Sequence, residues 1–495
     1  MMVVILSWLI SIITVIGTGI FLLNLYISQA HKYWETKGIF TPKTSPIVGH
    51  ILDLILFRTT VAELLKHYYD QIDERFFGIY IFDEPILVIK DPDLIKNVLI
   101  EDFHHFSSRY IGISHDEIQK NMLFFQKYTE WKSTRAKLSP VFTISKLKSM
   151  VPLLEAIVDD LVQFLNENQG VIEAKEITAK FTTDAIARCA FGIEAGSFVQ
   201  KMPVFREAGR KLFENSLRNA ISQLIHVFKP SWTQKLKLCF FYQPSVRYFK
   251  SVFLDTLYNR NDSYRCNDLI DILNDMRKNE KSEDIDENKL AASAFQFFVA
   301  SFETTSATIS FTLYELCVNE EAQRRLRTEI NEVVEKFGGI TMESLKEMRY
   351  LDMCINETLR KYPVLPYLDR VCTLDYTIPG TDIQIEKGRG IMIPMYGLHM
   401  DPNYFPEPSK YDPERFAYKN SNMNEIHLPF GGGPRNCIGE RFGKLSMQVA
   451  LVNIIKNFKV EMCQETPNPI KFDRKTFLLT SDVGLPMKIT KIKCS

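Results

Sequence analysis

The sequence of 495 residues contains few cysteines, and their arrangement excludes two common uses of this residue. The nine cysteines are odd in number, lie far apart and include no C-x-x-C pair, so neither a disulfide framework nor a zinc site is indicated. We therefore expect the folded part of the chain to lie in a reducing compartment, where a single thiolate can stay available as a ligand.

The chain also lacks an excess of charge of either sign, because 60 Lys and Arg residues balance 60 Asp and Glu residues. Bulk electrostatics thus gives no reason to expect a nucleic acid or a strongly acidic partner. There is no internal repeat and no low-complexity block. Hydrophobic residues make up 45% of the chain and include 35 Phe, enough to bury a large core and to line an apolar pocket. The function must therefore come from local sites.

Charged residues are missing from Val3 to Ile27, and 25 helical residues at about 1.5 Å each exceed a hydrocarbon core of roughly 30 Å. A membrane anchor fits this long run better than a cleaved signal peptide, because no basic residue precedes it. Lys32 and Lys37 follow the run, so the positive-inside bias places the rest of the chain on the cytosolic side. This division predicts an anchor at residues 1–30, a proline-containing connector at residues 31–50 and a globular domain at residues 51–495.

The remaining pattern alternates between helices and a few strands. Gly78–Phe82 and Ile86–Ile89 predict a β-hairpin, and Asp91 followed by Pro92 then caps and opens a helix. Glu287–Val318 contains neither Gly nor Pro and predicts a long helix that crosses the core. A second β-rich region is expected at about Arg370–Pro394, where Gly and Pro mark turns. The predicted fold is mainly α with a minor β region.

The loop Phe430–Gly439 surrounds one cysteine, Cys437, with features that suit a metal-bound thiolate. Its run of three consecutive glycines followed by a proline cannot extend a helix or strand, and the backbone N–H groups of such a loop can turn toward a negatively charged sulfur. Arg435 is a fixed cation suited to a carboxylate. A buried free cysteine beside an ordinary turn is the alternative interpretation. A phosphate-binding loop is excluded, because the glycine spacing is too short and Leu445 stands where Ser or Thr is required.

Phe430, Gly433, Arg435, Cys437 and Gly439 together resemble the haem-binding signature of the cytochromes P450. The resemblance implies a P450 fold with an N-terminal transmembrane helix, in which residues 51–495 form a haem-thiolate catalytic domain. It also implies heme b, the iron-protoporphyrin IX, as cofactor. Cys437 would be the axial metal ligand, and Phe430, Arg435 and Gly439 would contact the cofactor. A thiolate ligand favours cleavage of the O–O bond.

Trp131 and Arg135 are spaced i and i+4, so a helix would place the indole and the guanidinium on one face. Taken alone, such a pair is more often a surface cation–π contact. The resemblance instead implies that both side chains bind haem propionates, because the W-x-x-x-R pattern lies where the family has its lateral haem helix. Arg370 matches the family position for another propionate contact.

Glu357 and Arg360 form an E-x-x-R pair on a helix that Pro363 ends. The motif alone is weak, since it recurs at Glu207/Arg210 and Glu321/Arg324, where an exposed salt bridge is the ordinary interpretation. The resemblance extends to Pro413–Phe416, and it implies that Arg415 completes a buried network with Glu357 and Arg360. We assign these three residues a structural role beneath the cofactor.

Glu303 and Thr304 lie midway along the long predicted helix. A carboxylate beside a hydroxyl can organise water for proton delivery, and the resemblance implies that catalytic role for both. The alternative is a polar helix face whose threonine bonds back to a carbonyl. Ser301 departs from the family pattern, in which glycine is common, and we expect it to narrow the oxygen-binding groove and affect coupling.

By position, the resemblance also implies a substrate pocket that includes parts of the segment Phe106–Phe124. Any Phe or Leu among these residues is equally consistent with ordinary core. The expected lining residues are Phe124, Phe298, Val299, Ala300, Val364, Leu365, Leu478 and Leu479.

The chain looks most similar to microsomal insect P450s that oxidise lipophilic toxins. This implies a monooxygenase of the endoplasmic reticulum membrane, with its catalytic domain in the cytosol and NADPH electrons supplied by NADPH-cytochrome P450 reductase. Cytochrome b5 is a further candidate partner. Lys137, Arg441 and Lys444 would offer cations to the acidic reductase, unless they are merely solvated surface charges.

Three other functions remain open at this stage. One is a biosynthetic P450 acting on an endogenous lipid or hormone. Another is a haem-thiolate isomerase or dehydratase that uses no O₂ and would not need Glu303 and Thr304 for proton delivery. The third is a haem- or lipid-binding protein without catalysis.

Overall fold

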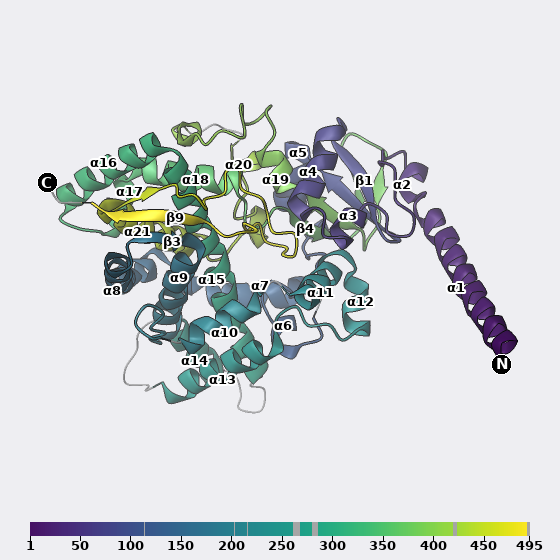
Figure 1. Ribbon diagram of the computed structural model, residues 1–495, viewed down its shortest axis with the longest axis horizontal. Helices are drawn as coiled ribbons and strands as arrows, with labels where there is room; N and C mark the ends of the chain where they lie inside the picture. Colours follow the sequence, from purple (N-terminus) through teal and green to yellow (C-terminus); the bar gives the residue numbers. More distant parts are fainter. Residues whose placement is uncertain are drawn as a thin grey trace.

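The computed structural model describes residues 1–112, 114–201, 203–214, 216–260, 268–279, 286–418 and 423–492. Helix α1 (Met2–Ala30) projects away from the rest of the protein, next to the β-rich end, and the C-terminus lies at the opposite end (Figure 1). This helix is long and apolar enough to cross a membrane, and its most apolar stretch is unburied. The predicted anchor therefore exists as one exposed apolar helix.

A four-stranded sheet lies beside α1. Strands β1 (Phe76–Ile81) and β2 (Glu84–Ile89) pair antiparallel, which confirms the predicted hairpin. Strand β7 (Gly390–Ile393) pairs parallel with β2 and antiparallel with β4 (Leu368–Val371), giving the order β1-β2-β7-β4. This sheet thus brings the first and the second predicted β regions together.

The segment between α1 and the sheet is docked on the sheet. Trp34, in α2 (Tyr33–Thr36), is fully buried; its backbone N–H donates to the hydroxyl of Tyr80 at 2.8 Å and its indole N–H to the carbonyl of Ile79 at 3.1 Å. A Cβ at Gly78 would lie 2.2 Å from the indole, so this strand position requires glycine. The anchor is therefore joined to the domain through packed residues.

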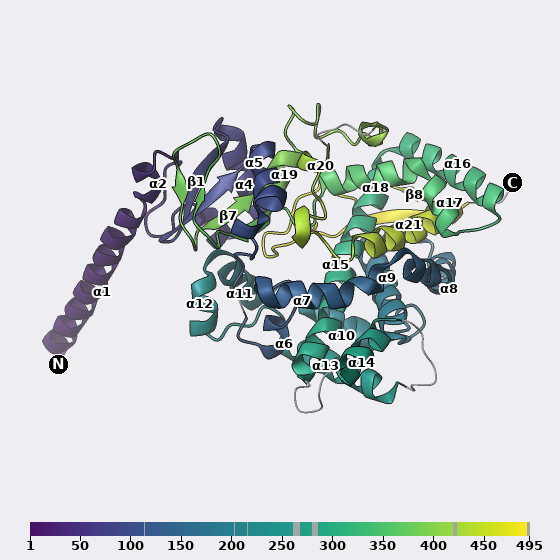
Figure 2. The ribbon, with the colours of Figure 1, turned by 180° about the vertical axis from the view of Figure 1, so that it is seen from behind.

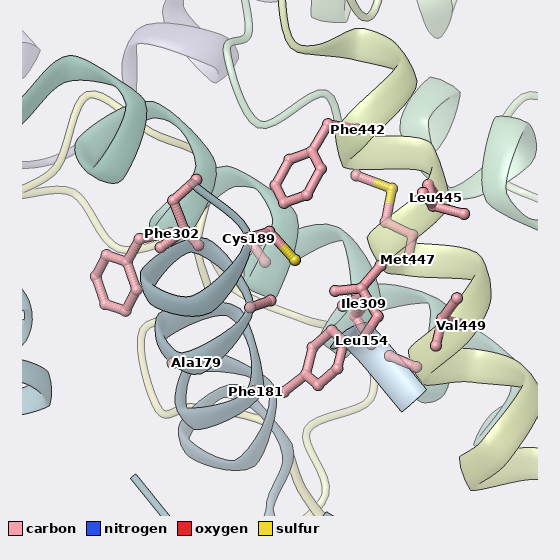
Figure 3. Packing of buried hydrophobic residues seen from close by; sticks show 14 of the residues in the cluster. Leu154, Ala179, Phe181, Cys189, Phe302, Ile309, Phe442, Leu445, Met447 and Val449 are labelled. Atoms are coloured by element: carbon pink, nitrogen blue, oxygen red, sulfur yellow. The ribbon is translucent and has the colours of Figure 1, made fainter. Parts of the chain in front are cut away.

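Helix α15 (Glu287–Val318) has the predicted bounds and crosses the middle of the protein (Figure 2). It packs against α9 (Ala174–Phe191), α13 (Gln243–Asn259), α18 (Arg349–Lys361) and α21 (Glu440–Asn457). Figure 3 shows Leu154, Phe181, Ile309 and Val449 gathered in the core, whereas Phe302 points away from α21. Different faces of α15 therefore pack against different neighbouring helices.

A three-stranded sheet that the sequence did not suggest joins distant parts of the chain in the order β3-β9-β8. Its strands are β3 (Gly170–Glu173), β8 (Phe458–Glu461) and β9 (Pro486–Lys491), and a small hairpin pairs β5 (Tyr376–Thr377) with β6 (Gln384–Ile385). Helices dominate the remainder, which confirms a mainly α fold. The other α-helices are α3 (Leu52–Ile55), α4 (Val61–Gln71), α5 (Pro92–Lys96), α6 (Glu117–Lys120), α7 (Tyr128–Leu138), α8 (Ile144–Glu167), α10 (Val204–Leu212), α11 (Leu217–Phe228), α12 (Pro230–Lys235), α14 (Leu269–Asn279), α16 (Glu320–Phe337), α17 (Met342–Glu347), α19 (Met395–His399) and α20 (Met423–Ile426).

Candidate functional site

The loop before α21 holds Cys437 through backbone contacts. The N–H of Cys437 donates to the carbonyl of Phe430 at 2.8 Å, and the N–H of Gly431 donates to the carbonyl of Leu428 at 2.8 Å. At Gly433 the backbone adopts φ +69°, and a Cβ there would lie 1.7 Å from the carbonyl oxygen of Leu99. This position therefore excludes every residue with a side chain, and the loop conformation is tightly specified.

The thiol of Cys437 is accessible, although the surrounding protein desolvates it. The Cys437 side chain has exposed surface, yet burial by the neighbouring protein raises the pKa of the thiol. The N–H of Gly439 and the guanidinium of Arg135 act in the opposite direction and lower this pKa. We take the accessible surface to open on an internal space, because a thiol on the outer surface would not be desolvated.

Helix α15 passes beside the segment that follows Cys437. An added Cβ at Gly439 would lie 3.8 Å from the ring of Phe142, which stacks on Phe297 of α15 with ring centroids 5.2 Å apart. An added Cβ at Gly443 would lie 3.8 Å from the hydroxyl of Thr305. The stretch Phe297–Thr305 therefore lies along the same side of the protein interior as the cysteine loop.

Four arginines gather near Cys437, and of these only Arg109 has a carboxylate partner among the described residues; the other three are Arg135, Arg370 and Arg435. Arg370 is 1% exposed and its Nε has no hydrogen-bond partner in the part of the chain that the structure describes. Burial, and then repulsion by Arg109, lowers the pKa of Arg370 and of Arg435 to about 9. Asp369 lies among them, but it already accepts from Arg109 at 3.1 Å.

This excess of buried positive charge fits a ligand with two carboxylates. An unpaired buried charge is costly, so an anionic group that paired with Arg370 and Arg435 would be strongly favoured there. The ring of Trp131 lies beneath Arg435, with the guanidinium 4.4 Å from the ring centroid, and Arg135 is 5.7 Å from the same ring. The sequence reasoning missed Arg109, which carries no motif and meets the others only in the fold.

The residue types near Cys437 also fit a cofactor whose metal is already coordinated by the cofactor itself. Across the described ranges, no three His, Cys, Asp or Glu side chains gather in a way that could hold a metal ion. Cys437 alone would therefore suit a metal already held by a macrocycle, and the arginines would suit the two propionates of heme b.

Glu357 and Arg360 form a fully buried ion pair on α18. Arg360 donates to both carboxylate oxygens of Glu357, at 2.7 and 2.8 Å, and to the carbonyl of His399 at 2.8 Å. Arg415 lies 3.3 Å from Glu357, and the N–H of Asp412 donates to the same oxygen at 2.9 Å. The structure thus brings the three predicted network residues together.

His399 connects this network to the cysteine loop and was not foreseen. Its Nδ1 lies 3.2 Å from the carbonyl of Arg360, and its Nε2 accepts from the N–H of Leu428 at 3.1 Å. Burial lowers the pKa of His399 far below its usual range, so the imidazole is neutral and can donate at one nitrogen while it accepts at the other. Leu428 in turn bonds to Gly431 inside the loop.

Thr304 forms a hydrogen bond within its own helix, and Glu303 forms an ion pair with a neighbouring helix. The hydroxyl of Thr304 donates to the carbonyl of Ala300 at 2.6 Å, as in the back-bonded alternative. The carboxylate of Glu303 pairs with Lys175 of α9 at 2.9 Å, and Lys175 also donates to the hydroxyl of Ser306 at 2.5 Å. The proton-delivery role of Glu303 and Thr304 stays a prediction, with Lys175 as a neighbour that the sequence did not reveal.

The expected pocket residues fall in several places. The N–H of Leu479 donates to the carbonyl of Val364 at 2.9 Å, which joins the segments that contain Leu365 and Leu478. The ring of Phe124 lies 4.3 Å from the guanidinium carbon of Arg109.

Phe298 differs from the expected pocket residues around it. Its ring contacts those of Phe205 and Phe249, with centroids 5.2 and 4.3 Å apart, in the core toward α10 and α13. Since it lies two residues from Ala300 and therefore on another helix face, we do not carry Phe298 into the pocket. Val299 is buried, whereas Ala300 is exposed in the middle of the helix.

Comparison with known proteins agrees with this geometry. Residues 41–486 match the family model described as Cytochrome P450. The chain is 38% identical to Cytochrome P450 6k1 of Blattella germanica, covering 97% of each chain, and 36% identical to Cytochrome P450 6j1 of the same species, covering 98% of each. It is 35% identical to Probable cytochrome P450 6g2 of Drosophila melanogaster, covering 94% of this chain and 96% of the relative. A match of this extent means that the chain belongs to the cytochrome P450 family of oxidoreductases, which bind heme b through a cysteine thiolate and receive NADPH electrons through a reductase.

Proposed function

We propose that the protein is a monooxygenase that inserts one oxygen atom from O₂ into lipophilic small molecules of the xenobiotic, plant-toxin or insecticide type. The observation that carries this proposal is the accessible yet desolvated thiol of Cys437 on the loop before α21, because α21 packs against α15, on which Ala300 and Thr304 are accessible. When bound, heme b supplies the activation of dioxygen, which a thiolate ligand promotes.

The residues around Cys437 have separate tasks in this proposal. Cys437 would hold the iron of heme b, and its propionates would be held by Arg370, Arg435, Trp131 and Arg135. The N–H of Gly439 stabilises the thiolate charge. Phe430 shields the sulfur; the ammonium of Lys444 lies 5.3 Å from its ring centroid. The network of Glu357, Arg360 and Arg415 keeps the loop in position through His399.

Proton delivery is the proposed task of Thr304 and Glu303. The hydroxyl of Thr304 donates its proton to the carbonyl of Ala300, so its oxygen is free to accept a hydrogen bond from water. The side chain of Glu303, the residue before Thr304, is 12% exposed and pairs with Lys175 at 2.9 Å. The two side chains would then relay protons from water toward the space that the cofactor would occupy.

The substrate would enter an apolar pocket lined by Phe124, Val299, Ala300, Val364, Leu365, Leu478 and Leu479. Transfer of apolar surface from water supplies the binding free energy, at roughly 25 cal/mol for each Å² buried. We infer from this lining that the substrate is lipophilic, with few polar groups.

We further propose that the protein lies in the endoplasmic reticulum membrane through α1, with its domain in the cytosol and the reductase docked near Lys137, Arg441 and Lys444. Lys137 and Arg441 are exposed, and Lys444 pairs with Glu440 at 3.2 Å. Reversing Arg441 to Glu should slow electron transfer and weaken its dependence on salt, while the exposed Arg58→Glu control should change neither.

The monooxygenase reaction is tested with the haem-loaded protein, purified reductase, NADPH and a panel of lipophilic compounds under ¹⁸O₂. We expect products that each contain one ¹⁸O atom and NADPH-dependent consumption of oxygen. Conversion without oxygen consumption would instead identify an isomerase or dehydratase. Reduction of the haem without any product across the panel would contradict the proposal.

A further inference from the structure

Asn436, the residue directly before Cys437, accepts two hydrogen bonds from one arginine of α7. Nη1 of Arg135 donates to the backbone carbonyl of Asn436 at 2.7 Å, and Nη2 donates to its side-chain Oδ1 at 2.6 Å. A guanidinium held at two points has a fixed direction, whereas one held at a single point can swing about it. The guanidinium of Arg135 is therefore fixed against the loop that carries Cys437.

The contact includes the peptide bond that joins Asn436 to Cys437. The carbonyl oxygen of this peptide accepts from Arg135, and its N–H, which belongs to Cys437, donates to the carbonyl of Phe430 at 2.8 Å. The N–H of Asn436 donates to the carbonyl of Gly433 at 3.0 Å. Hydrogen bonds in such a chain polarise one another, so the positions of Arg135 and Cys437 depend on each other.

An asparagine at this position orients the arginine without neutralising it. Asparagine offers a neutral acceptor oxygen, whereas aspartate would offer the same oxygen with a compensating negative charge. Burial lowers the pKa of Arg135, while the thiolate of Cys437 raises it, so the two groups are close enough for their charges to interact. Arg135 therefore keeps a positive charge in a fixed place near the sulfur.

We propose that Asn436 is a positioning residue that holds the charge of Arg135 near the Cys437 sulfur and thereby raises the reduction potential of the bound haem. A fixed positive charge favours the reduced iron, because reduction adds one negative charge to the site. The bonds to Asn436 use two of the five N–H donors of the guanidinium, which leaves donors for a propionate. This inference goes beyond the proposed function, since it needs the bound cofactor but neither O₂ nor a substrate.

The test measures the reduction potential of the haem-loaded full chain by spectroelectrochemistry, under nitrogen and without substrate. The variants are Asn436→Leu, which has a similar shape but no acceptor, Asn436→Ala, Arg135→Met and the double variant Asn436→Leu/Arg135→Met. Asn453→Ala is the control, because Asn453 donates to the carbonyl of Val449 at 2.9 Å. It lies roughly 20 Å along the axis of α21 from Glu440.

We expect Arg135→Met to lower the equilibrium constant for one-electron reduction by about tenfold, which corresponds to about 59 mV in potential. Asn436→Leu and Asn436→Ala should each lower it by about threefold to tenfold, because the guanidinium loses one of its two acceptors. Asn436→Leu should cause no further change when Arg135→Met is already present, since the asparagine acts through the arginine. Asn453→Ala should leave the potential unchanged.

An unchanged potential in Arg135→Met, or in either Asn436 variant that binds haem, would overturn the proposal. So would an equal fall on Asn436→Leu with and without Arg135, because the asparagine would then act through the loop alone. Failure of the monooxygenase reaction would appear separately, as absence of NADPH-dependent product, and would leave these potentials as expected.

Discussion

The hydroxyl of Thr304 is the side chain on which the proposed proton delivery depends most. Thr304→Ala removes this hydroxyl and should keep the haem, while product formation per NADPH falls by about tenfold or more and hydrogen peroxide rises. Thr308→Ala is a matched control, since Thr308 donates back to the carbonyl of Thr304 at 3.0 Å on the same helix. Product yield and peroxide are measured together. An unchanged product yield per NADPH in Thr304→Ala would refute the relay.

Arg435 tests the propionate-binding role of the arginine cluster without using catalysis. Its Nε and Nη2 donate to the carbonyls of Ser107 and Gln126, and it has no carboxylate partner among the described residues. Arg435→Met should speed haem transfer to excess apomyoglobin by roughly tenfold to a hundredfold, because a hydrogen bond to a charged group contributes about 1.5–3 kcal/mol. Arg324→Met, which alters an exposed pair with Glu321, should leave the rate unchanged. Equal rates in both variants would remove Arg435 from the site.

Helix α18 and the cysteine loop behave as one unit through the buried ion pair and His399. Glu357→Ala leaves Arg360 buried and unpaired, so we expect a loss of about 3–5 kcal/mol in the free energy of unfolding. Glu321→Ala breaks a pair of the same i,i+3 spacing on the solvent-exposed surface of α16 and should change the free energy of unfolding very little. Urea unfolding of the haem-loaded proteins measures both values. Similar losses in the two variants would show that burial of the Glu357 pair does not matter.

Much at the level of single elements could be predicted from the sequence where local residues decide the outcome. The bounds of α15 follow from an apolar run without Gly or Pro, and the side chain of Asp91 caps α5 by accepting from the N–H of Leu94 at 3.0 Å. The pairing of β3 with β9 could not be predicted, because it joins segments about 300 residues apart that carry no shared motif. The same holds for His399, whose role exists only through its contacts with Arg360 and Leu428.

In the candidate site too, contacts between segments that are far apart in the sequence could not be predicted. Cys437 and its loop stand out in the sequence because glycine, arginine and cysteine occur at fixed short spacings. Arg109 and Lys175 carry no such pattern, and each acquires its partner from a distant segment. The sequence predicts Phe298 in the pocket, whereas its ring lies against Phe249. Position in the chain alone does not reveal which face of α15 turns toward Phe249.

Across the protein, buried histidines should make stability fall as the pH decreases. Burial lowers the pKa of His50 to about 4 and that of His399 further, so both stay neutral in the folded protein while the unfolded chain takes up protons below about pH 6.5. Each then removes about 2 kcal/mol of stability between pH 7 and pH 5. Asp184, whose pKa burial raises to about 6, offsets part of this loss by taking up a proton in the folded state.

Urea midpoints at pH 7 and pH 5 measure this dependence. His50→Gln should show a smaller drop than the unsubstituted protein, whereas the exposed His67→Gln should show the same drop. A drop of equal size in His50→Gln would mean that the buried imidazole does not titrate between the two states.

The most direct test of the account is the absorption spectrum of the reduced, purified protein under carbon monoxide. A thiolate of Cys437 on the haem iron predicts the long-wavelength Soret shift, and Cys437→His should lose this shift and all turnover while it still binds haem. A control variant, Cys372→Ser, changes a buried cysteine and should keep the shift. Folded, haem-containing protein without the shift would contradict the assignment of residue 437 as the iron ligand.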